Sequence, residues 1–323
     1  MRDSFQYVDK SDKKRNSHIR ACGIGVGMIT QKKMKEWYPE ILAGFEKTMP
    51  DIKRPLPELV IGTKATWMKK RAFLIEQLQS NQINPDGIGA METIHGVNGD
   101  VILVYQHILG NQVNDYSEFR HCIWHELGHV TAINTQNPSF IRFMDQQPHP
   151  DEYEAFRGYF FWSEFIAEKT ACDLEPEVEI DWSKADYRIA RNHLGRYLVD
   201  GTEMKDDVID WYWLSFYFAR VLSDKVIQGY LKAAEDGTLK CHRAYGDKEM
   251  PFNESGIDPL CLDIIDESFR PIVMEIKGIL DSQIKRNNPY DVSFETISAL
   301  GDWVISIERL HKMNEFRQKL GLF

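Results

Sequence analysis

Two histidines and a glutamate stand at a spacing suited to metal chemistry near the middle of the chain. The segment FRHCIWHELGHV (119–130) contains an HExxH motif, formed by His125, Glu126 and His129. Residues four apart lie on one face of a helix, so both imidazoles can approach a single tetrahedral ion. Glu126 lies roughly 100° further around the helix, where its carboxylate can take a proton from a metal-activated water without ligating the ion. The motif therefore predicts a Zn2+ site with Glu126 as the general base.

A catalytic zinc ion takes three protein ligands and keeps one position for water. The extended metzincin pattern does not supply the third ligand, because Ala132 and Thr135 stand where that pattern has glycine and histidine. The segment WSEFIAEKTA (162–171) places Glu164 and Glu168 four apart on one face of another expected helix. Glu164 can therefore ligate zinc, while Glu168 accepts the free ring N–H of a ligand histidine.

Two other residues of the motif helix need an interpretation. His121 lies one turn before His125, but ligands at i, i+4 and i+8 would span about 12 Å, too far to meet at one ion. We therefore expect His121 to have a structural or outer-shell role. Gly128 is a poor helix former in mid-helix, and a close approach by another backbone or side chain would account for it.

The elements that must position these residues form a mixed α/β front half and a helical back half. Two β-prone runs joined by a turn containing Asn98 and Gly99 give the strongest hairpin signal in the sequence. The motif helix is expected to begin after Asn114 and Asp115, which are plausible caps. Expected helices cover 31–48, 65–78, 116–133, 162–172, 184–199, 206–234, 260–286 and 294–320, and expected strands cover 59–61, 88–95 and 100–107.

The two motifs together resemble those of the gluzincins, the thermolysin-like zinc metallopeptidases, and are most similar to their compact intracellular members. In that family HExxH is followed by a glutamate ligand on the next helix and by an acidic residue four positions later. The resemblance implies His125, His129 and Glu164 as zinc ligands, Glu126 as the base and Glu168 as the acidic partner behind the ligands. It further implies a metallopeptidase that hydrolyses peptide bonds in a peptide or protein substrate.

The resemblance covers about residues 59–172 and also sets the expected domain organisation. We expect an α+β protein with a zincin-like front half, in which a small mixed sheet carries the active-site helix. A flexible tail (1–20) precedes the zincin-like catalytic region (21–175). A mostly helical C-terminal region (176–323) follows and completes the cleft.

Two further parts of a substrate cleft follow from the same resemblance. Gluzincins stabilise the oxyanion with a Tyr or His from the helical half, and we select His193 over Tyr187 and Tyr197 on the same expected helix. Zincins bind substrate along an edge strand before the active helix, and Asp100 to His107 is the expected strand here. The aromatic residues between Trp211 and Phe218 are expected to fill a core rather than a specificity pocket.

Composition and charge limit the classes of partner. A net charge of −10 and a pI near 5.5 leave no basic field for phosphates, so we expect no nucleic-acid partner. The absence of an apolar run of about 18 residues, and of an apolar N-terminal core, indicates neither a membrane partner nor a secretory signal. Five scattered cysteines without a CxxC pair favour a reducing, cytoplasmic location.

Two other functions remain open from the sequence. The first is a non-catalytic zincin-fold protein that binds a partner or regulates transcription, although an intact Glu126 argues against it. The second is a metal-dependent amidase acting on a non-peptide substrate, which a closed cavity instead of an open groove would favour. An unrestrained cytosolic peptidase would be harmful, so we expect a narrow cleft, selective docking or a regulatory protein partner to limit access.

Overall fold

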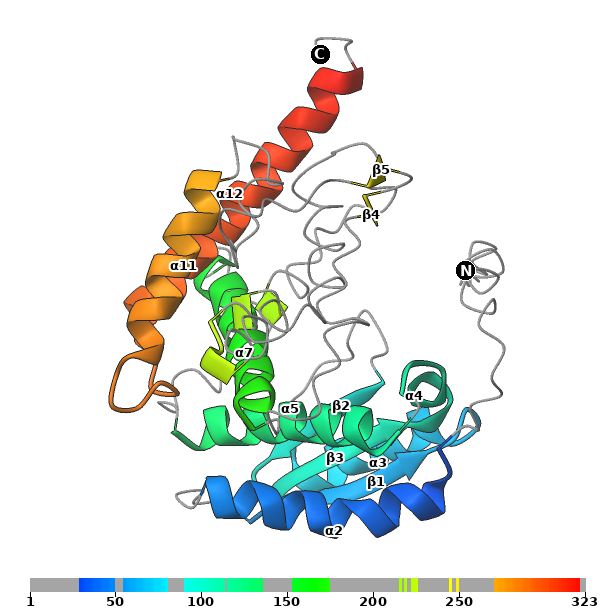
Figure 1. Cartoon of the computed structure of the whole chain (residues 1–323). Helices are drawn as coiled ribbons and strands as arrows, with labels where there is room; N and C mark the ends of the chain where they lie inside the picture. Colours follow the sequence, from blue (N-terminus) through cyan, green and yellow to red (C-terminus); the bar gives the residue numbers. More distant parts are fainter. Residues whose placement is uncertain are drawn as a thin grey trace, which may run out of the picture.

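Helices make up most of the described part of the chain, and three strands form a small mixed sheet, as the computed structural model in Figure 1 shows. The expected α+β class is therefore confirmed at this level. The structure describes residues 29–49, 55–80, 90–113, 115–135, 153–174, 215–216, 218–219, 222–225, 244–245, 248–249 and 270–319.

The three-stranded sheet has β3 (Gly99–Tyr105) in its centre. β1 (Glu58–Gly62) pairs with β3 in parallel. β2 (Met91–Gly96) pairs with β3 antiparallel, and these two strands form the expected hairpin. The expectation that Asp100 to His107 is an edge strand is therefore wrong, and its last two residues belong to α4 (Gln106–Gln112). The hairpin is a local pattern, whereas the parallel partner comes from far along the chain, where periodicity alone does not reveal pairing.

Helix α3 (Trp67–Leu78) covers one face of the sheet. Its buried Trp67 and Leu74 pack in one cluster with Val101 and Leu103, which are alternate residues of β3 and so point to the same face. Among the described residues α3 is the helix packed on this face, and the elements that carry the motif lie on the opposite face.

Helices α2 (Gln31–Thr48) and α5 (Tyr116–Thr135) cover the other face of the sheet. Ile102 and Val104, the remaining alternate residues of β3, pack in the same cluster as the buried side chains of both helices. Asp115 caps α5 as expected, because its Oδ1 accepts a hydrogen bond from the Glu118 backbone N–H at 2.9 Å. The sheet thus supports the first part of α5, from Phe119 to Leu127.

Helix α7 (Tyr153–Leu174) packs against α5 at the side of the sheet and extends from there to the C-terminal helices (Figure 1). It is already helical nine residues before the expected start at Trp162, in a stretch whose aromatic and charged residues lack a simple amphipathic pattern. Ala155, Tyr159 and Ile166 are buried at helical spacing with Trp162, so tertiary packing rather than local propensity maintains this first part of the helix.

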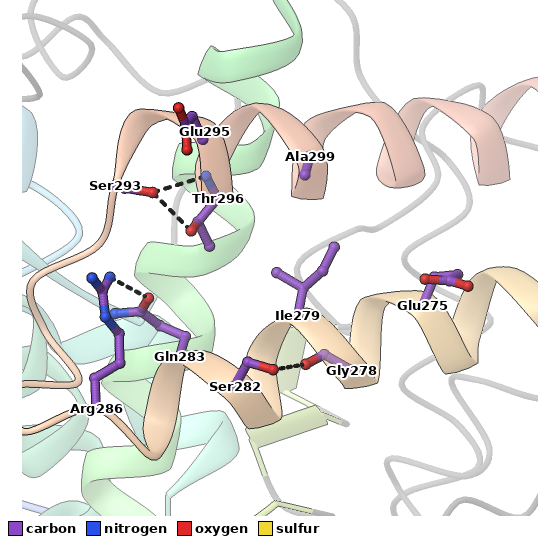
Figure 2. A pocket seen from close by; sticks show the side chains of 10 residues that line it. All are labelled: Glu275, Gly278, Ile279, Ser282, Gln283, Arg286, Ser293, Glu295, Thr296 and Ala299. Carbon is purple, nitrogen blue, oxygen red and sulfur yellow. Dashed lines mark hydrogen bonds between the residues drawn. The ribbon is translucent and has the colours of Figure 1, made fainter.

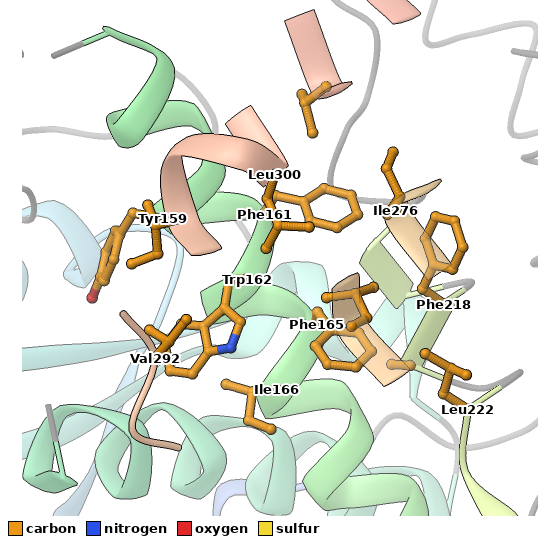
Figure 3. Close-up of a cluster of buried hydrophobic side chains, with 14 of the residues drawn as sticks. Tyr159, Phe161, Trp162, Phe165, Ile166, Phe218, Leu222, Ile276, Val292 and Leu300 are labelled. Carbon is orange, nitrogen blue, oxygen red and sulfur yellow. The ribbon is translucent and has the colours of Figure 1, made fainter. Parts of the chain in front are cut away.

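A second core lies between α7, α11 (Arg270–Ile284) and α12 (Phe294–Lys319), as Figure 3 shows. Gly158 and Gly301 lie where α7 meets α12, and a β-carbon at either position would collide with the backbone of the other helix. The close crossing lets large side chains fill the remaining space, among them Tyr159, Phe161, Trp162, Phe165, Ile276 and Leu300.

The helical back half is confirmed only where the chain is described. α12 coincides with the expected helix 294–320, and α11 lies within the expected helix 260–286, of which residues 260–269 are outside the described residues. β4 (Ala244–Tyr245) and β5 (Lys248–Glu249) form a short antiparallel ladder that we did not expect. The expected helix 184–199 and the expected tail 1–20 lie outside the described residues, and 206–234 is described only in part.

Candidate metal centre

Helices α5 and α7 bring together the three residues expected to ligate zinc. Candidate ligand atoms of His125, His129 and Glu164 all lie within 4.8 Å of one another. The Nε2 atom of His125 lies 3.4 Å from Glu164 Oε2, and the Nε2 atom of His129 lies 3.6 Å from Glu164 Oε1. Ligand atoms about 2.0–2.1 Å from a tetrahedral ion stand about 3.3 Å apart, so this arrangement requires little movement to hold zinc.

The close crossing of α5 and α7 depends on Gly128. A β-carbon at this position would lie 2.7 Å from the Ala167 Cα and 2.9 Å from the Ala167 carbonyl oxygen. Gly128 lies between the two histidines in sequence, and Ala167 lies between the two glutamates. The missing side chain therefore lets the two motif-bearing helices approach, which explains a glycine in mid-helix.

Each candidate histidine ligand is held through its other ring nitrogen. Glu168 Oε2 lies 3.1 Å from His125 Nδ1, and Ser163 Oγ lies 3.0 Å from His129 Nδ1. When Nδ1 carries the proton of the neutral ring, Nε2 is left with its lone pair toward Glu164, as ligation requires. Sequence reasoning identified Glu168 but missed Ser163, although Ser163 directly precedes Glu164.

Charge and burial act differently on the two histidines. Burial disfavours the imidazolium of His125, but the neighbouring carboxylates of Glu164 and Glu168 outweigh this effect and raise the pKa of His125 to about 10. Burial dominates at His129 and lowers its pKa to about 3, with Glu164 opposing. Burial also acts against ionised Glu164, but the neighbouring His129 and His125 hold the pKa of that carboxyl below its usual value. The site thus offers an ionised carboxylate from Glu164 and an unprotonated imidazole from His129.

The Glu126 carboxylate contacts strand β2 and lies close enough to His125 and Glu164 for their charges to act on it. Its Oε2 accepts a hydrogen bond from the Thr93 hydroxyl at 2.6 Å. Burial raises the pKa of Glu126 to about 7, and this shift is opposed by the positive charge of His125 and by the Thr93 hydrogen bond. A carboxyl with a pKa near neutrality can both accept and return a proton.

The hairpin adds a histidine that sequence reasoning did not select. His95 follows Thr93 by two residues on β2, so the two side chains share the strand face that meets α5. His95 Nδ1 lies 2.9 Å from Oδ1 of the buried Asp100, its partner across the hairpin. His95 is also close enough to His129 to contribute to the lowered pKa of His129. In the sequence, the alternate positions of Thr93 and His95 on an expected strand indicated that both side chains lie on the same face.

An aromatic ring also borders the centre. The Phe216 ring lies 5.0 Å from the His125 ring, whereas Phe218 is fully buried in the second core. The expectation that this aromatic segment only fills a core is therefore correct for Phe218 and incomplete for Phe216. His193, the expected oxyanion donor, lies outside the described residues.

The burial and the donor atoms of the residues in the centre fit a divalent cation. Glu164 Oε2 is buried and has no hydrogen-bond partner within the described residues, although His125 Nε2 is only 3.4 Å away. A buried carboxylate oxygen without a hydrogen bond is costly unless a cation satisfies it. Two imidazoles and one carboxylate are a donor set that zinc accepts in catalytic sites.

Other described features lie apart from this centre. An open groove of about 640 Å³ runs between α11 and α12, lined by residues such as Glu275, Gln283 and Thr296, and Figure 2 shows it without convergent metal-ligand groups. None of its lining residues belongs to the metal centre. Across the described ranges, no helix is both long enough and apolar enough to cross a membrane.

The metal centre is therefore defined by helix crossing, ligand spacing and the contacts behind each ligand. Comparison of the chain with known proteins adds no assignment to this geometry. No model of a protein family matches the chain, and no curated protein and no solved structure matches it.

Proposed function

We propose that this chain is a zinc-dependent peptidase of the gluzincin type. One observation carries the proposal: His125, His129 and Glu164 converge from two helices at spacings of 3.4 and 3.6 Å, with Glu126 beside them. A carboxylate that is adjacent to a cation site but not part of it suits a general base. A purely structural zinc site would have protein ligands at all four coordination positions and would not need a base beside the ion.

The residues divide the chemistry among them. Zinc bound at this centre would polarise the scissile carbonyl and lower the pKa of a water molecule. Glu126 accepts one proton from the water while the water oxygen forms a bond to the carbonyl carbon of the substrate. The same carboxyl then gives the proton to the amide nitrogen as the C–N bond breaks, which a pKa of about 7 permits in both directions. Glu168 and Ser163 keep the ligand rings oriented throughout.

The edge strand β2 supports a peptide as the substrate. Within the described residues β2 pairs only with β3, so its other edge can offer backbone N–H and C=O groups to an extended chain. β2 also packs on α5, and its Thr93 contacts the proposed base. A peptide added along β2 would therefore run beside Glu126, the role we expected from residues 100–107.

His95 is our candidate for a donor to the oxyanion within the described residues. It lies on the same strand face as Thr93, and the buried Asp100 orients its ring by accepting from Nδ1. Nε2 is then the ring nitrogen that remains to donate to the oxyanion when it carries a proton. His193 keeps this role as an alternative, and replacing each histidine by asparagine would separate them through kcat.

The test combines metal content with cleavage of a peptide library. Wild-type protein should carry about one zinc in the His125 centre, and both Glu164→Ala and His129→Ala should lose it. Glu126→Gln should retain this zinc but show no cleavage, because only the base is removed. A wild-type protein that neither carries nor takes up zinc would overturn the proposal. Zinc binding without peptide cleavage would favour a non-peptide amidase or a binding protein.

A further inference from the structure

We propose a second metal site, formed by His121, Glu168 and Cys172, that takes a thiophilic divalent cation such as Zn2+ or Cd2+. Candidate ligand atoms of these three residues lie within 4.8 Å of one another. Two come from α7 and one from α5, so the site uses the same helix crossing as the first centre. An imidazole, a carboxylate and a thiolate form a set that zinc and cadmium accept.

The distances fit one ion between the three side chains. His121 Nε2 lies 3.3 Å from both oxygens of Glu168, and Cys172 Sγ lies 4.0 Å from Glu168 Oε1. A tetrahedral ion with bonds of about 2.0 Å to nitrogen and oxygen and 2.3 Å to sulfur separates its ligands by about 3.3–3.6 Å. Bringing Cys172 Sγ to this separation from Glu168 Oε1 needs a movement of about half an ångström.

Burial and access also suit a bound ion. Glu168 and Cys172 are almost fully buried, which excludes competing water from the carboxylate and the thiol. The His121 side chain is 23% exposed, so an ion can reach the site from its imidazole side. A buried carboxylate is costly to maintain unless paired, and a cation held together with the thiolate would add to the contacts that His121 and His125 already make with Glu168.

Glu168 would then connect two metal sites through its two oxygens. Oε2 faces His125 Nδ1 of the first centre, whereas Oε1 is the oxygen closer to Cys172. An ion on Oε1 withdraws negative charge from the carboxylate that orients His125. Because such partners change metal affinity by about 10–100-fold, we expect the second ion to weaken the first site by up to about 10-fold.

The alternative is that His121 and Cys172 only hold Glu168 in place through hydrogen bonds. Cobalt titration of the metal-stripped full chain under reducing, oxygen-free conditions distinguishes the two. Wild type should bind two ions and develop the near-ultraviolet charge-transfer band of a cobalt–thiolate bond. Cys172→Ser and His121→Asn should each bind one ion fewer, and Cys172→Ser should lose the band.

Two variants make the assignment specific. Cys122→Ser removes a thiol adjacent to His121 in sequence but outside the cluster, so it should keep both ions and the band. His129→Ala should lose the first ion and keep the band. A band that survives in Cys172→Ser, or a wild type that shows none, overturns the second site. Peptide cleavage is not measured, so the second site and the proposed function can fail separately.

Discussion

The Thr93 hydroxyl on β2 lies 2.6 Å from the Oε2 atom of Glu126 and 3.2 Å from the backbone oxygen of the same residue. A hydroxyl has one proton to donate, and the shorter distance favours the charged carboxylate. The edge of the sheet is thereby tied directly to the candidate base on α5. The position and the protonation of Glu126 both depend on this contact.

Replacing Thr93 by valine should shift the pH dependence of cleavage. The hydrogen bond stabilises the ionised carboxylate, so its loss raises the pKa of Glu126 further above its current value of about 7. Only the ionised form accepts a proton, and activity therefore falls as pH drops below the pKa. A shift of about one unit, equal to about 1.4 kcal/mol, should lower kcat/KM about 10-fold at pH 6 and little at pH 9. Thr93→Ser, which keeps the hydroxyl, should show the wild-type profile.

Gly128→Ala should weaken both the fold and the metal site. The added methyl group would stand 2.7 Å from the Ala167 Cα, so α5 and α7 must move apart. Alanine is intrinsically the better helix former by about 1 kcal/mol, and a net loss of stability therefore reports the helix crossing. We expect a decrease of about 1–3 kcal/mol in the free energy of unfolding by denaturant, with at least 10-fold weaker zinc binding.

The matched control is Gly278→Ala on α11, where the new β-carbon would meet no atom of another element within 4 Å among the described residues. Here the helix propensity acts alone, and unfolding should require up to about 1 kcal/mol more free energy. Zinc affinity should not change. If both variants were stabilised equally, the helices would not be in contact at Gly128.

The parts predictable from sequence were those determined by residue type at short spacing. The hairpin at Asn98 and Gly99, the Asp115 cap and the motif helix all follow from local patterns. The convergence of His125, His129 and Glu164 also followed, because helical periodicity places each chemical group on a defined face. Gly128 carried long-range information, since an otherwise unfavourable residue in a helix implied a close neighbour.

The parts that could not be predicted depend on contacts between distant segments. β1 inserts beside β3 in parallel, and this pairing moves the edge of the sheet to β2. Thr93 and His95 acquire their roles only once that edge faces α5. The early start of α7 likewise comes from packing against α12, which no local pattern in residues 153–161 specifies.

Zinc should stabilise the wild-type protein against heat, because an ion that binds only the folded state shifts the unfolding equilibrium. At a free zinc concentration 100 times Kd, the gain is about 2.7 kcal/mol. Glu164→Gln keeps the size of the side chain but removes its charge. In the Cys172→Ser background, where the second site is absent, it should lose most of the zinc-dependent rise in Tm. Scanning calorimetry with and without a chelator measures the zinc-dependent change in Tm of the wild type and of the variant. A variant with the full wild-type shift would show that Glu164 is not a ligand.

Zinc binding to the first centre at pH 8, measured in Cys172→Ser so that the second site does not contribute, should release about one proton from His125. Without the ion, Glu164 and Glu168 raise the pKa of His125 to about 10, so its ring is protonated at pH 8 and must lose that proton to ligate. Glu126, with a pKa of about 7, is mostly ionised at this pH and contributes little. Calorimetric titration in two buffers of different ionisation enthalpy gives the number of protons released. Glu168→Gln removes one of the two carboxylates that favour the imidazolium, so the release should be smaller, and an unchanged release would exclude Glu168 as its cause.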